Sequence, residues 1–224
     1  MGLVLAAGAG RRYGTPKILV PGWLDAAVAA LRGGGCGRIV VVTGAARPPL
    51  PQGCVEAWSE GWADGPGASL ATGLAAALGA AETGGHDADA RQDAAPGVVI
   101  RLVDTPDIGA DCVARVVHEA GLGPGPDPGA TTPRTPPAPA RATFHGVPGH
   151  PVALPARVAH DLAAHLTAAD PGRGAGPFLA RRTDVRDVEC ADLATGQDVD
   201  SPAEAASPAG VPERTNQARD RLGR

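Results

Sequence analysis

Short runs of β-branched residues alternate with Ala/Leu-rich stretches along this chain, and that alternation restricts its fold more than any other feature. The run 38–43, Arg-Ile-Val-Val-Val-Thr, is almost continuously apolar, as expected for a parallel strand buried on both faces. The stretch 23–32 has apolar residues at helical spacing and is followed by Gly33–Gly35, which favour helix termination. The pattern therefore predicts an α/β domain with a mostly parallel central sheet.

The same patterns predict the rest of the architecture. We expect one domain over residues 1–206, followed by a polar tail over 207–224. The stretches 82–97 and 123–141 lack periodicity and are rich in Gly, Asp or Pro, so mobile surface loops are expected there, with a proline-ligand site as the alternative for the second. The remaining strands are expected at 3–7, 55–58, 98–103, 142–145, 152–154 and 185–189, and the remaining helices at 69–81, 110–120, 157–168 and from Pro202.

Composition and charge exclude several classes of protein. Although 32 Gly and 23 Pro raise the question of low complexity, 43% apolar residues and a net charge of −4 argue against disorder. The slight excess of acidic residues offers no basic surface for nucleic acid or an anionic membrane. No apolar run approaches the roughly 18 residues of a membrane-spanning helix, and no positive segment precedes the first apolar stretch as in a signal peptide.

The cysteines give an expectation about the cellular compartment. Cys36, Cys54, Cys112 and Cys190 are scattered along the chain, without the C-x-x-C pair of zinc and redox sites. A disulfide scaffold is not expected at this chain length. We therefore expect reduced, mostly buried thiols in a cytoplasmic protein.

A glycine-rich loop follows the first expected strand and ends at Lys17, the only lysine of the chain. Its sequence from Leu5 to Lys17 is Leu-Ala-Ala-Gly-Ala-Gly-Arg-Arg-Tyr-Gly-Thr-Pro-Lys. Glycines permit positive φ and a close approach of the backbone to an anion, and successive amide N–H groups form an anion-binding concavity. Arg12 and Lys17 add positive charge. The loop therefore predicts polyphosphate binding, with an ordinary glycine turn as the alternative. The loop glycines are Gly8, Gly10 and Gly14.

Two common phosphate-binding motifs do not match this loop. A Walker P-loop requires Gly-Lys-Ser/Thr, whereas Lys17 follows Pro16 and precedes Ile18. A dinucleotide fingerprint requires an acidic residue that binds the ribose at the end of the next strand, and the run 38–43 is followed by Gly-Ala-Ala.

The loop resembles the signature loop of the MobA-like nucleotidyltransferases, and within that family it is most similar to the molybdenum cofactor cytidylyltransferases. The resemblance covers most of residues 3–206 and implies a single Rossmann-like, three-layer α/β domain. It also implies transfer of a nucleotidyl group from an NTP to a phosphate-bearing acceptor, with release of pyrophosphate. Five further segments match family motifs in order: 62–74, 103–106, 149–151, 170–175 and 198–204.

The resemblance also implies roles for individual residues. Arg12 and Lys17 would grip the triphosphate as catalytic cations, with Lys17 near the α-phosphate, while Arg11 is expected to be solvated, with direct phosphate contact as the alternative. Ser69 and Gly73 would line the base and ribose pocket, although Ser69 could equally act as a helix N-cap. The full set of nucleotide-binding residues implied is Leu5, Ala6, Ala7, Gly8, Gly10, Arg12, Gly14, Lys17, Ser69 and Gly73.

Two carboxylates are implied as ligands of Mg²⁺, which prefers hard oxygen donors. Asp104 follows an expected central strand at the end where open α/β sheets bind ligands, and it would be the catalytic metal ligand; a turn aspartate before Thr-Pro is the alternative. Asp200 would be the second ligand by similarity, with Asp198 as its competitor and a helix cap before Pro202 as the structural alternative.

The implied substrates are an NTP, with CTP favoured and GTP possible, and a small phosphorylated acceptor such as molybdopterin. His150 would hold the acceptor, with a structural turn histidine as the alternative. The product could then be handed over to a molybdoenzyme or its chaperone.

Three departures from the family pattern keep other functions open. The segment 18–22 is shorter than the family's hairpin after the lysine, Ser59 replaces a family Asn, and the insert 123–140 is unusually Pro-rich. The alternatives are a transferase of the same fold acting on a sugar 1-phosphate or another small phosphate, and a noncatalytic relative that binds a nucleotide or a partner.

Overall fold

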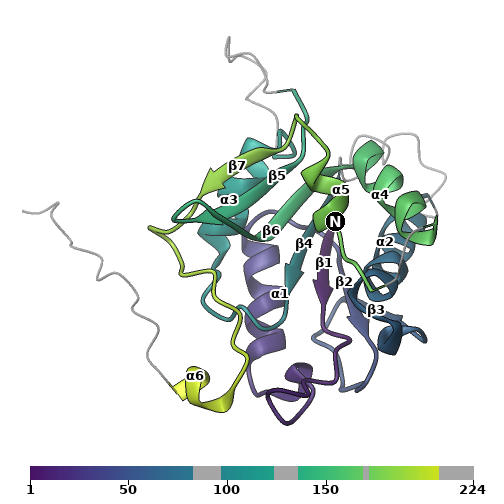
Figure 1. The fold of residues 1–224 in the computed structure, drawn as a ribbon, viewed down its shortest axis with the longest axis vertical. Helices are drawn as coiled ribbons and strands as arrows, with labels where there is room; N and C mark the ends of the chain where they lie inside the picture. Colours follow the sequence, from purple (N-terminus) through teal and green to yellow (C-terminus); the bar gives the residue numbers. More distant parts are fainter. Residues whose placement is uncertain (83–96, 124–135, 169–171, 207–224) are drawn as a thin grey trace, which may run out of the picture.

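Seven strands form one sheet in the computed structural model, which describes residues 1–82, 97–123, 136–168 and 172–206 (Figure 1). The strands are β1 (Gly2–Leu5), β2 (Ile39–Thr43), β3 (Cys54–Trp58), β4 (Gly97–Leu102), β5 (Ala140–Phe144), β6 (Val147–Pro155) and β7 (Arg186–Glu189). Their order is β3-β2-β1-β4-β6-β5-β7, and every neighbouring pair is parallel except the two that involve β6. The predicted α/β, Rossmann-like architecture with a mostly parallel sheet is confirmed.

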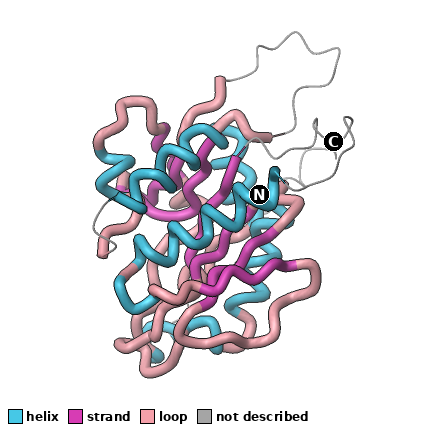
Figure 2. Tube along the Cα trace, turned by 90° about the vertical axis from the view of Figure 1, so that its right-hand side faces the viewer, coloured by secondary structure: helices cyan, strands magenta, loops and turns pink. Residues whose placement is uncertain are grey.

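Helices cover both faces of the sheet and complete three layers (Figures 1 and 2). On one face, α1 and α3 pack on alternate residues of the central strands, including Val4 and Val41. On the other face, α2 and α4 pack on the intervening residues, including Leu3 and Val40. The helices on both faces bury all five residues of β2, which explains why its sequence is an almost unbroken apolar run. The helices are α1 (Trp23–Gly33), α2 (Pro66–Glu82), α3 (Ala110–Glu119), α4 (Ala156–Ala168), α5 (Gly176–Ala180) and α6 (Pro202–Ala206), with 3₁₀ turns η1 (Lys17–Leu19) and η2 (Trp62–Asp64).

The glycines after α1 serve both helix termination and packing. The N–H of Gly34 donates to the carbonyl of Ala30, and Gly35 has a φ of 96°, a left-handed conformation that favours glycine. Gly34 also lies against Val113 of α3 so closely that a Cβ would overlap its side chain. The run of small residues therefore lets α1 and α3 approach each other on one face of the sheet.

Two elements differ from the sequence expectations in ways that affect the site. Helix α2 begins at Pro66, three residues earlier than predicted, because Gly65 adopts a φ of 135° and proline suits the first helical position. Ser69 is therefore inside the first turn and is not the N-cap. Strand β6 extends over Val147–Pro155, so His150 is in a strand and the turn predicted around it is wrong.

Several expectations lie wholly or partly outside the described residues. They are most of the predicted surface loops 82–97 and 123–141, the tail 207–224, and the first two residues of the 170–175 motif. Among the residues that the structure describes, none of the helices combines the length and apolarity needed to cross a membrane.

We predict that Gly73→Ala destabilises the fold by about 1–3 kcal/mol, since a Cβ there would lie 2.6 Å from Val42 Cγ2 and 2.8 Å from Leu3 Cδ1 on the sheet. The matched control is Gly79→Ala in the same helix, where a Cβ meets nothing within 4 Å. That substitution should stabilise the protein by up to about 1 kcal/mol. Urea unfolding measures both, and equal stability of the two variants would contradict this packing of α2.

Candidate active site

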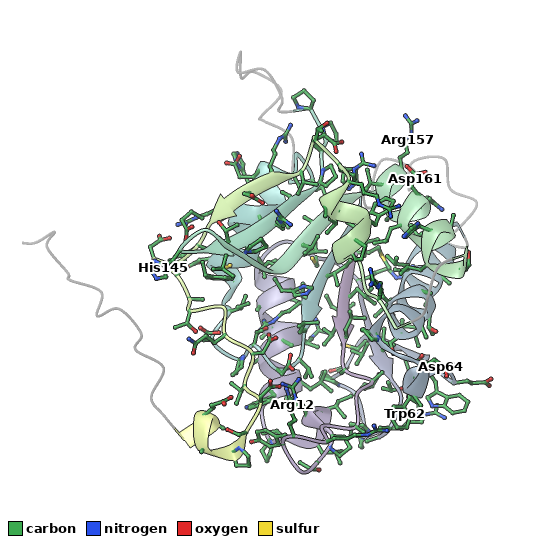
Figure 3. All side chains as sticks on the ribbon, in the orientation of Figure 1. Arg12, Trp62, Asp64, His145, Arg157 and Asp161 are labelled. Atoms are coloured by element: carbon green, nitrogen blue, oxygen red, sulfur yellow. The ribbon has the colours of Figure 1, made fainter. Side chains whose placement is uncertain are left out.

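The site forms at the carboxyl ends of β1 and β4, which are adjacent parallel strands. The glycine-rich loop leaves β1 at this edge, and Arg12 lies there in Figure 3, near the lower end of the sheet. The loop folds back on itself, since the N–H of Gly14 donates to the carbonyl of Gly10 at 2.8 Å. Gly10 and Gly14 have φ values of 60° and 92°, and a Cβ on Gly10 would overlap the carbonyl of Thr15. Glycine is therefore required at position 10.

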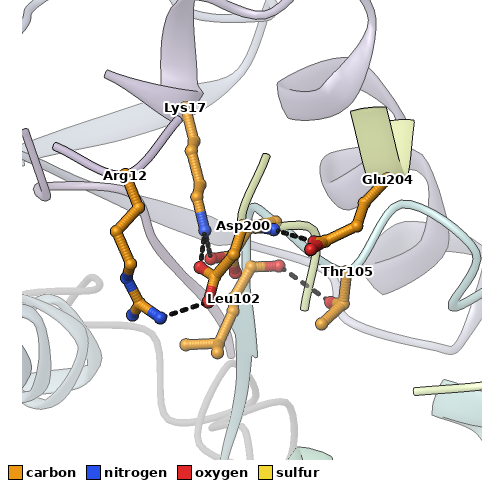
Figure 4. A network of polar contacts seen from close by, with 7 residues as sticks. Arg12, Lys17, Leu102, Thr105, Asp200 and Glu204 are labelled. Carbon is orange, nitrogen blue, oxygen red and sulfur yellow. Dashed lines mark hydrogen bonds and ion pairs between the residues drawn. The ribbon is translucent and has the colours of Figure 1, made fainter. Parts of the chain in front are cut away.

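The ammonium group of Lys17 lies between two carboxylates (Figure 4). Lys17 Nζ donates to Asp104 Oδ2 at 2.7 Å and to Asp200 Oδ1 at 2.9 Å. The side chains of Lys17 and Asp104 are only 14% and 18% exposed, so these contacts are weakly screened by solvent. The guanidinium of Arg12, which is 81% exposed, reaches the other oxygen of Asp200 at 2.5 Å. The Lys17 ammonium, from the segment after β1, thus binds two predicted carboxylates, Asp104 from the loop after β4 and Asp200 from the C-terminal segment.

These contacts shift the proton affinities in the site. Burial lowers the pKa of Lys17, but hydrogen bonds to Asp104 and Asp200 outweigh it, so the net pKa of Lys17 is raised. The hydrogen bond from Lys17 lowers the pKa of Asp200 below its ordinary value of 3.8. Burial, followed by the nearby charge of Asp104, raises the pKa of Asp198. At neutral pH the site therefore holds a charged Lys17 and an ionised Asp200.

Asp200 is fixed by the local structure that begins α6. The N–H of Asp200 donates to Glu204 Oε2 at 2.7 Å, and the N–H of Glu204 donates to Ser201 Oγ at 3.3 Å. This exchange resembles a capping box, with Pro202 at the first helical position. The predicted helix start at Pro202 is confirmed, and it orients the Asp200 carboxylate toward Lys17.

A cavity of about 600 Å³ opens beside this ion cluster, within the size range of small-molecule sites. One part of its wall carries the charged side chains and the other is formed by small and apolar residues of the β1 loop and the start of α2. The predicted nucleotide-binding residues that line it are Leu5, Ala6, Ala7, Gly8, Gly10, Arg12, Lys17 and Ser69, together with Asp104 and Asp200. The other lining residues are Ala9, Arg11, Trp62, Ala63, Gly65, Pro66, Leu102 and Val103.

Three predicted site residues lie outside this lining. Gly14 forms the turn described above, and Gly73 packs against the sheet beneath α2. The ring of His150 is in β6, where Nδ1 lies 3.3 Å from the carbonyl oxygen of Ile100 in β4. Because a carbonyl can only accept, Nδ1 carries the proton. Burial lowers the pKa of His150, which leaves Nε2 as an unprotonated acceptor at neutral pH.

Sequence reasoning missed some residues around the site. Trp62 was part of a matching motif but received no role, and it lines the cavity from η2. Arg101 is fully buried beneath the Asp104 loop and donates to the carbonyl of Thr105 at 2.7 Å. A charged residue inside the otherwise apolar run of β4 was the available signal for Arg101.

The carboxylates Asp104 and Asp200 fit a divalent cation. They converge on one positive charge, the Lys17 ammonium, and supply the hard oxygen donors that Mg²⁺ or Mn²⁺ prefers. Among the described residues, no group of three or more His, Cys, Asp or Glu side chains is arranged as a complete protein cage for a metal.

Comparison with known proteins supports the family resemblance. A family model described as "MobA-like NTP transferase domain" matches residues 2–185. No curated protein matches the sequence.

Solved structures match nearly the whole chain. A homologue of Mycobacterium tuberculosis Rv0371c from Mycobacterium sp. strain JC1 is 25% identical with a TM-score of 0.61, covering 91% of each chain. A nucleotidyl transferase from a Methanothermobacter species is 17% identical with a TM-score of 0.62, covering 91% of this chain and 93% of its own. Rv0371c from M. tuberculosis H37Rv in complex with manganese is 22% identical with a TM-score of 0.52, covering 84% and 86%. The last two matches are similarities of fold.

The ion cluster predicts a pH-dependent contribution of Asp200 to stability. Because the folded-state pKa of Asp200 is below 3.8, its stabilising effect is present above that pH and is lost as the pH falls through the folded-state value. Asp200→Asn should therefore lower the melting temperature at neutral pH, and the difference from wild type should shrink below pH 3.8. Thermal unfolding across pH measures this, and a difference that does not change with pH would contradict the ion-pair explanation.

Proposed function

Because the chain belongs to the family of MobA-like NTP transferase domains, we propose that it transfers CMP from CTP to a phosphate-bearing acceptor such as molybdopterin, releasing pyrophosphate. The observation that carries this proposal is the convergence of Lys17, Asp104 and Asp200 at the edge of a cavity large enough for a nucleotide. In the reaction, an acceptor phosphate oxygen forms a bond to the α-phosphorus while the bond to the bridging oxygen of pyrophosphate breaks.

The glycine-rich loop and two cations would bind the triphosphate. Loop amides between Gly8 and Gly14 supply hydrogen-bond donors, and Arg12 and Lys17 supply positive charge. In the free protein both side chains pair with Asp200, and nucleotide binding would turn them from this carboxylate toward phosphate. Lys17 would then neutralise charge that develops at the α-phosphate during transfer.

The departure of Lys17 would leave Asp104 and Asp200 facing each other without a shared cation. A divalent ion bound there would neutralise the carboxylates and polarise the phosphate oxygens. Mg²⁺ is our expectation, and the Rv0371c structure in complex with manganese supports a divalent-metal site in this fold. Asp104 and Asp200 would each provide one carboxylate ligand, and by holding the cation they would help to keep the α-phosphate in line with the acceptor.

The remaining cavity wall would take the nucleoside. Ser69, in the first turn of α2, and Ala6 and Ala7 of the loop line the part of the cavity formed by small residues. The acceptor would approach from the side of β6, which carries His150; because His150 does not line the cavity, its role in holding the acceptor requires contact beyond that lining. A sugar 1-phosphate or another small phosphate remains the alternative acceptor, and GTP the alternative nucleotide.

We further propose that the protein acts in the cytoplasm and hands its product to a molybdoenzyme or its chaperone. All four cysteines are free thiols, and Cys36, Cys112 and Cys190 are buried, which suits a reducing compartment.

The proposal predicts that Lys17→Met and Asp104→Asn each reduce pyrophosphate release from CTP and Mg²⁺ by about 10²-fold or more, because each removes a group that acts on the transferred phosphate. Coupled pyrophosphate detection with molybdopterin as acceptor measures this. The matched controls are Arg157→Met and Asp161→Asn, which change the same kinds of charge on α4, at the opposite end of the molecule from Arg12 (Figure 3).

Wild-type turnover in Lys17→Met or Asp104→Asn would contradict the proposed chemistry. A wild-type protein that CTP and Mg²⁺ protect against thermal unfolding, but that releases no pyrophosphate with molybdopterin or a sugar 1-phosphate, would support a noncatalytic nucleotide-binding relative instead.

A further inference from the structure

The two carboxylates of the site come from segments that the fold holds in place to different degrees. Asp104 lies in the turn just after Val103 at the end of β4, a buried strand with neighbours on both sides. Asp200 belongs to the segment between β7 and α6, residues 190–201, which has no helix or strand of its own. The distance between the carboxylates therefore depends on how this C-terminal segment is tied to the loop after β4.

One partly buried contact joins the two near the middle of the segment. Asp107 Oδ2 accepts two hydrogen bonds from Thr195, one from its backbone N–H and one from its hydroxyl, each at 2.6 Å. Asp107 is on the same short loop as Asp104, and Thr195 is on the same segment as Asp200. Because both contacts are short and partly buried, they are less exposed to competition from water than an ordinary surface hydrogen bond.

A second contact joins the same two segments closer to the site. The N–H of Val199 donates to the carbonyl of Asp104 at 2.9 Å. Between these ties the chain passes Gly196, which has a φ of 67° and lies so close to the ring of Phe144 that a Cβ would overlap it. The path of the segment from Thr195 to Asp200 is therefore set by the Asp104–Asp107 loop on one side and by β5 on another.

Arg101 supports this loop from below. Its side chain is fully buried and donates to the carbonyl of Thr105 at 2.7 Å and to that of Ala26 in α1 at 3.4 Å. Within the described residues, the buried side-chain atoms without a hydrogen-bond partner are Arg101 Nε and Asp107 Oδ1. A buried cation and a carboxylate that are not fully satisfied are costly for stability, which favours a positioning role.

We propose that Asp107 and Thr195, supported by Arg101, are positioning residues that set the spacing of the Asp104 and Asp200 carboxylates and thereby the affinity of the site for a divalent cation. This inference rests on the metal site of the proposed function. Groups that orient metal ligands through hydrogen bonds commonly change metal affinity by about 10–100-fold when they are removed. Neither Asp107 nor Thr195 lines the cavity, so their effect on the cation is indirect.

The test is Mn²⁺ binding without nucleotide, followed by electron paramagnetic resonance of the free ion. Thr195→Val keeps the shape of the side chain but removes the hydroxyl donor, and it should raise the Kd for Mn²⁺ about tenfold. Asp107→Ala removes both hydrogen bonds and should raise it at least as much. Thr195→Ser retains the donor and should restore a Kd close to that of the wild type.

The matched control is Asp192→Asn, which removes a different tie from the same segment. Asp192 pairs with Arg115 of α3 at 2.6 Å, but both groups are exposed and lie on the far side of Thr195 from Asp200. This control should leave the Kd close to wild type. Melting temperatures are measured in parallel, because a merely structural role for Thr195 would lower thermal stability without changing Mn²⁺ affinity below the unfolding transition.

The outcomes separate this inference from the function on which it rests. Wild-type Mn²⁺ affinity in both Thr195→Val and Asp107→Ala would contradict the positioning role while leaving the metal site intact. Equal weakening in Asp192→Asn would also contradict it, since any loosening of the segment would then suffice. Absence of Mn²⁺ binding in both the wild type and Lys17→Met, in which the competing ammonium is removed, would contradict the metal site itself, and the inference with it.

Discussion

The ammonium of Lys17 between the carboxylates of Asp104 and Asp200 is the interaction on which the organisation of this site depends. It joins the loop after β1, the loop after β4 and the C-terminal segment at one point. Without a cation there, two carboxylates would face each other with little screening by solvent. In the proposed function, this positive charge occupies the place of a divalent ion in the free protein and is transferred to phosphate when the nucleotide binds.

The fold explains how three distant segments reach that point. Because β1 and β4 are adjacent and parallel, their following loops emerge at the same edge of the sheet, the usual ligand-binding edge of open α/β sheets. Helix packing on both faces holds these strands rigidly, whereas the segment that bears Asp200 relies on individual hydrogen bonds.

Local sequence patterns predicted much of this arrangement. The features that they did not predict depend on contacts between residues far apart in the chain. Lys17, Asp104 and Asp200 were predicted through motifs that resemble those of the family, and Asp104 also through its place after an expected central strand. The length of β6 was missed because its prolines at 148, 151 and 155 are atypical of an inner strand. The contact between Asp107 and Thr195 joins residues 88 positions apart, and no periodicity signals such a pair.

The most direct test of the central claim is the affinity for Mn²⁺ in the absence of nucleotide, compared between the wild type and Lys17→Met. If the ammonium occupies the position of the divalent ion, removing its charge should strengthen Mn²⁺ binding by about tenfold or more. Arg157→Met, which removes a cation from α4, should leave the affinity unchanged. Equal or weaker Mn²⁺ binding in Lys17→Met would contradict the account.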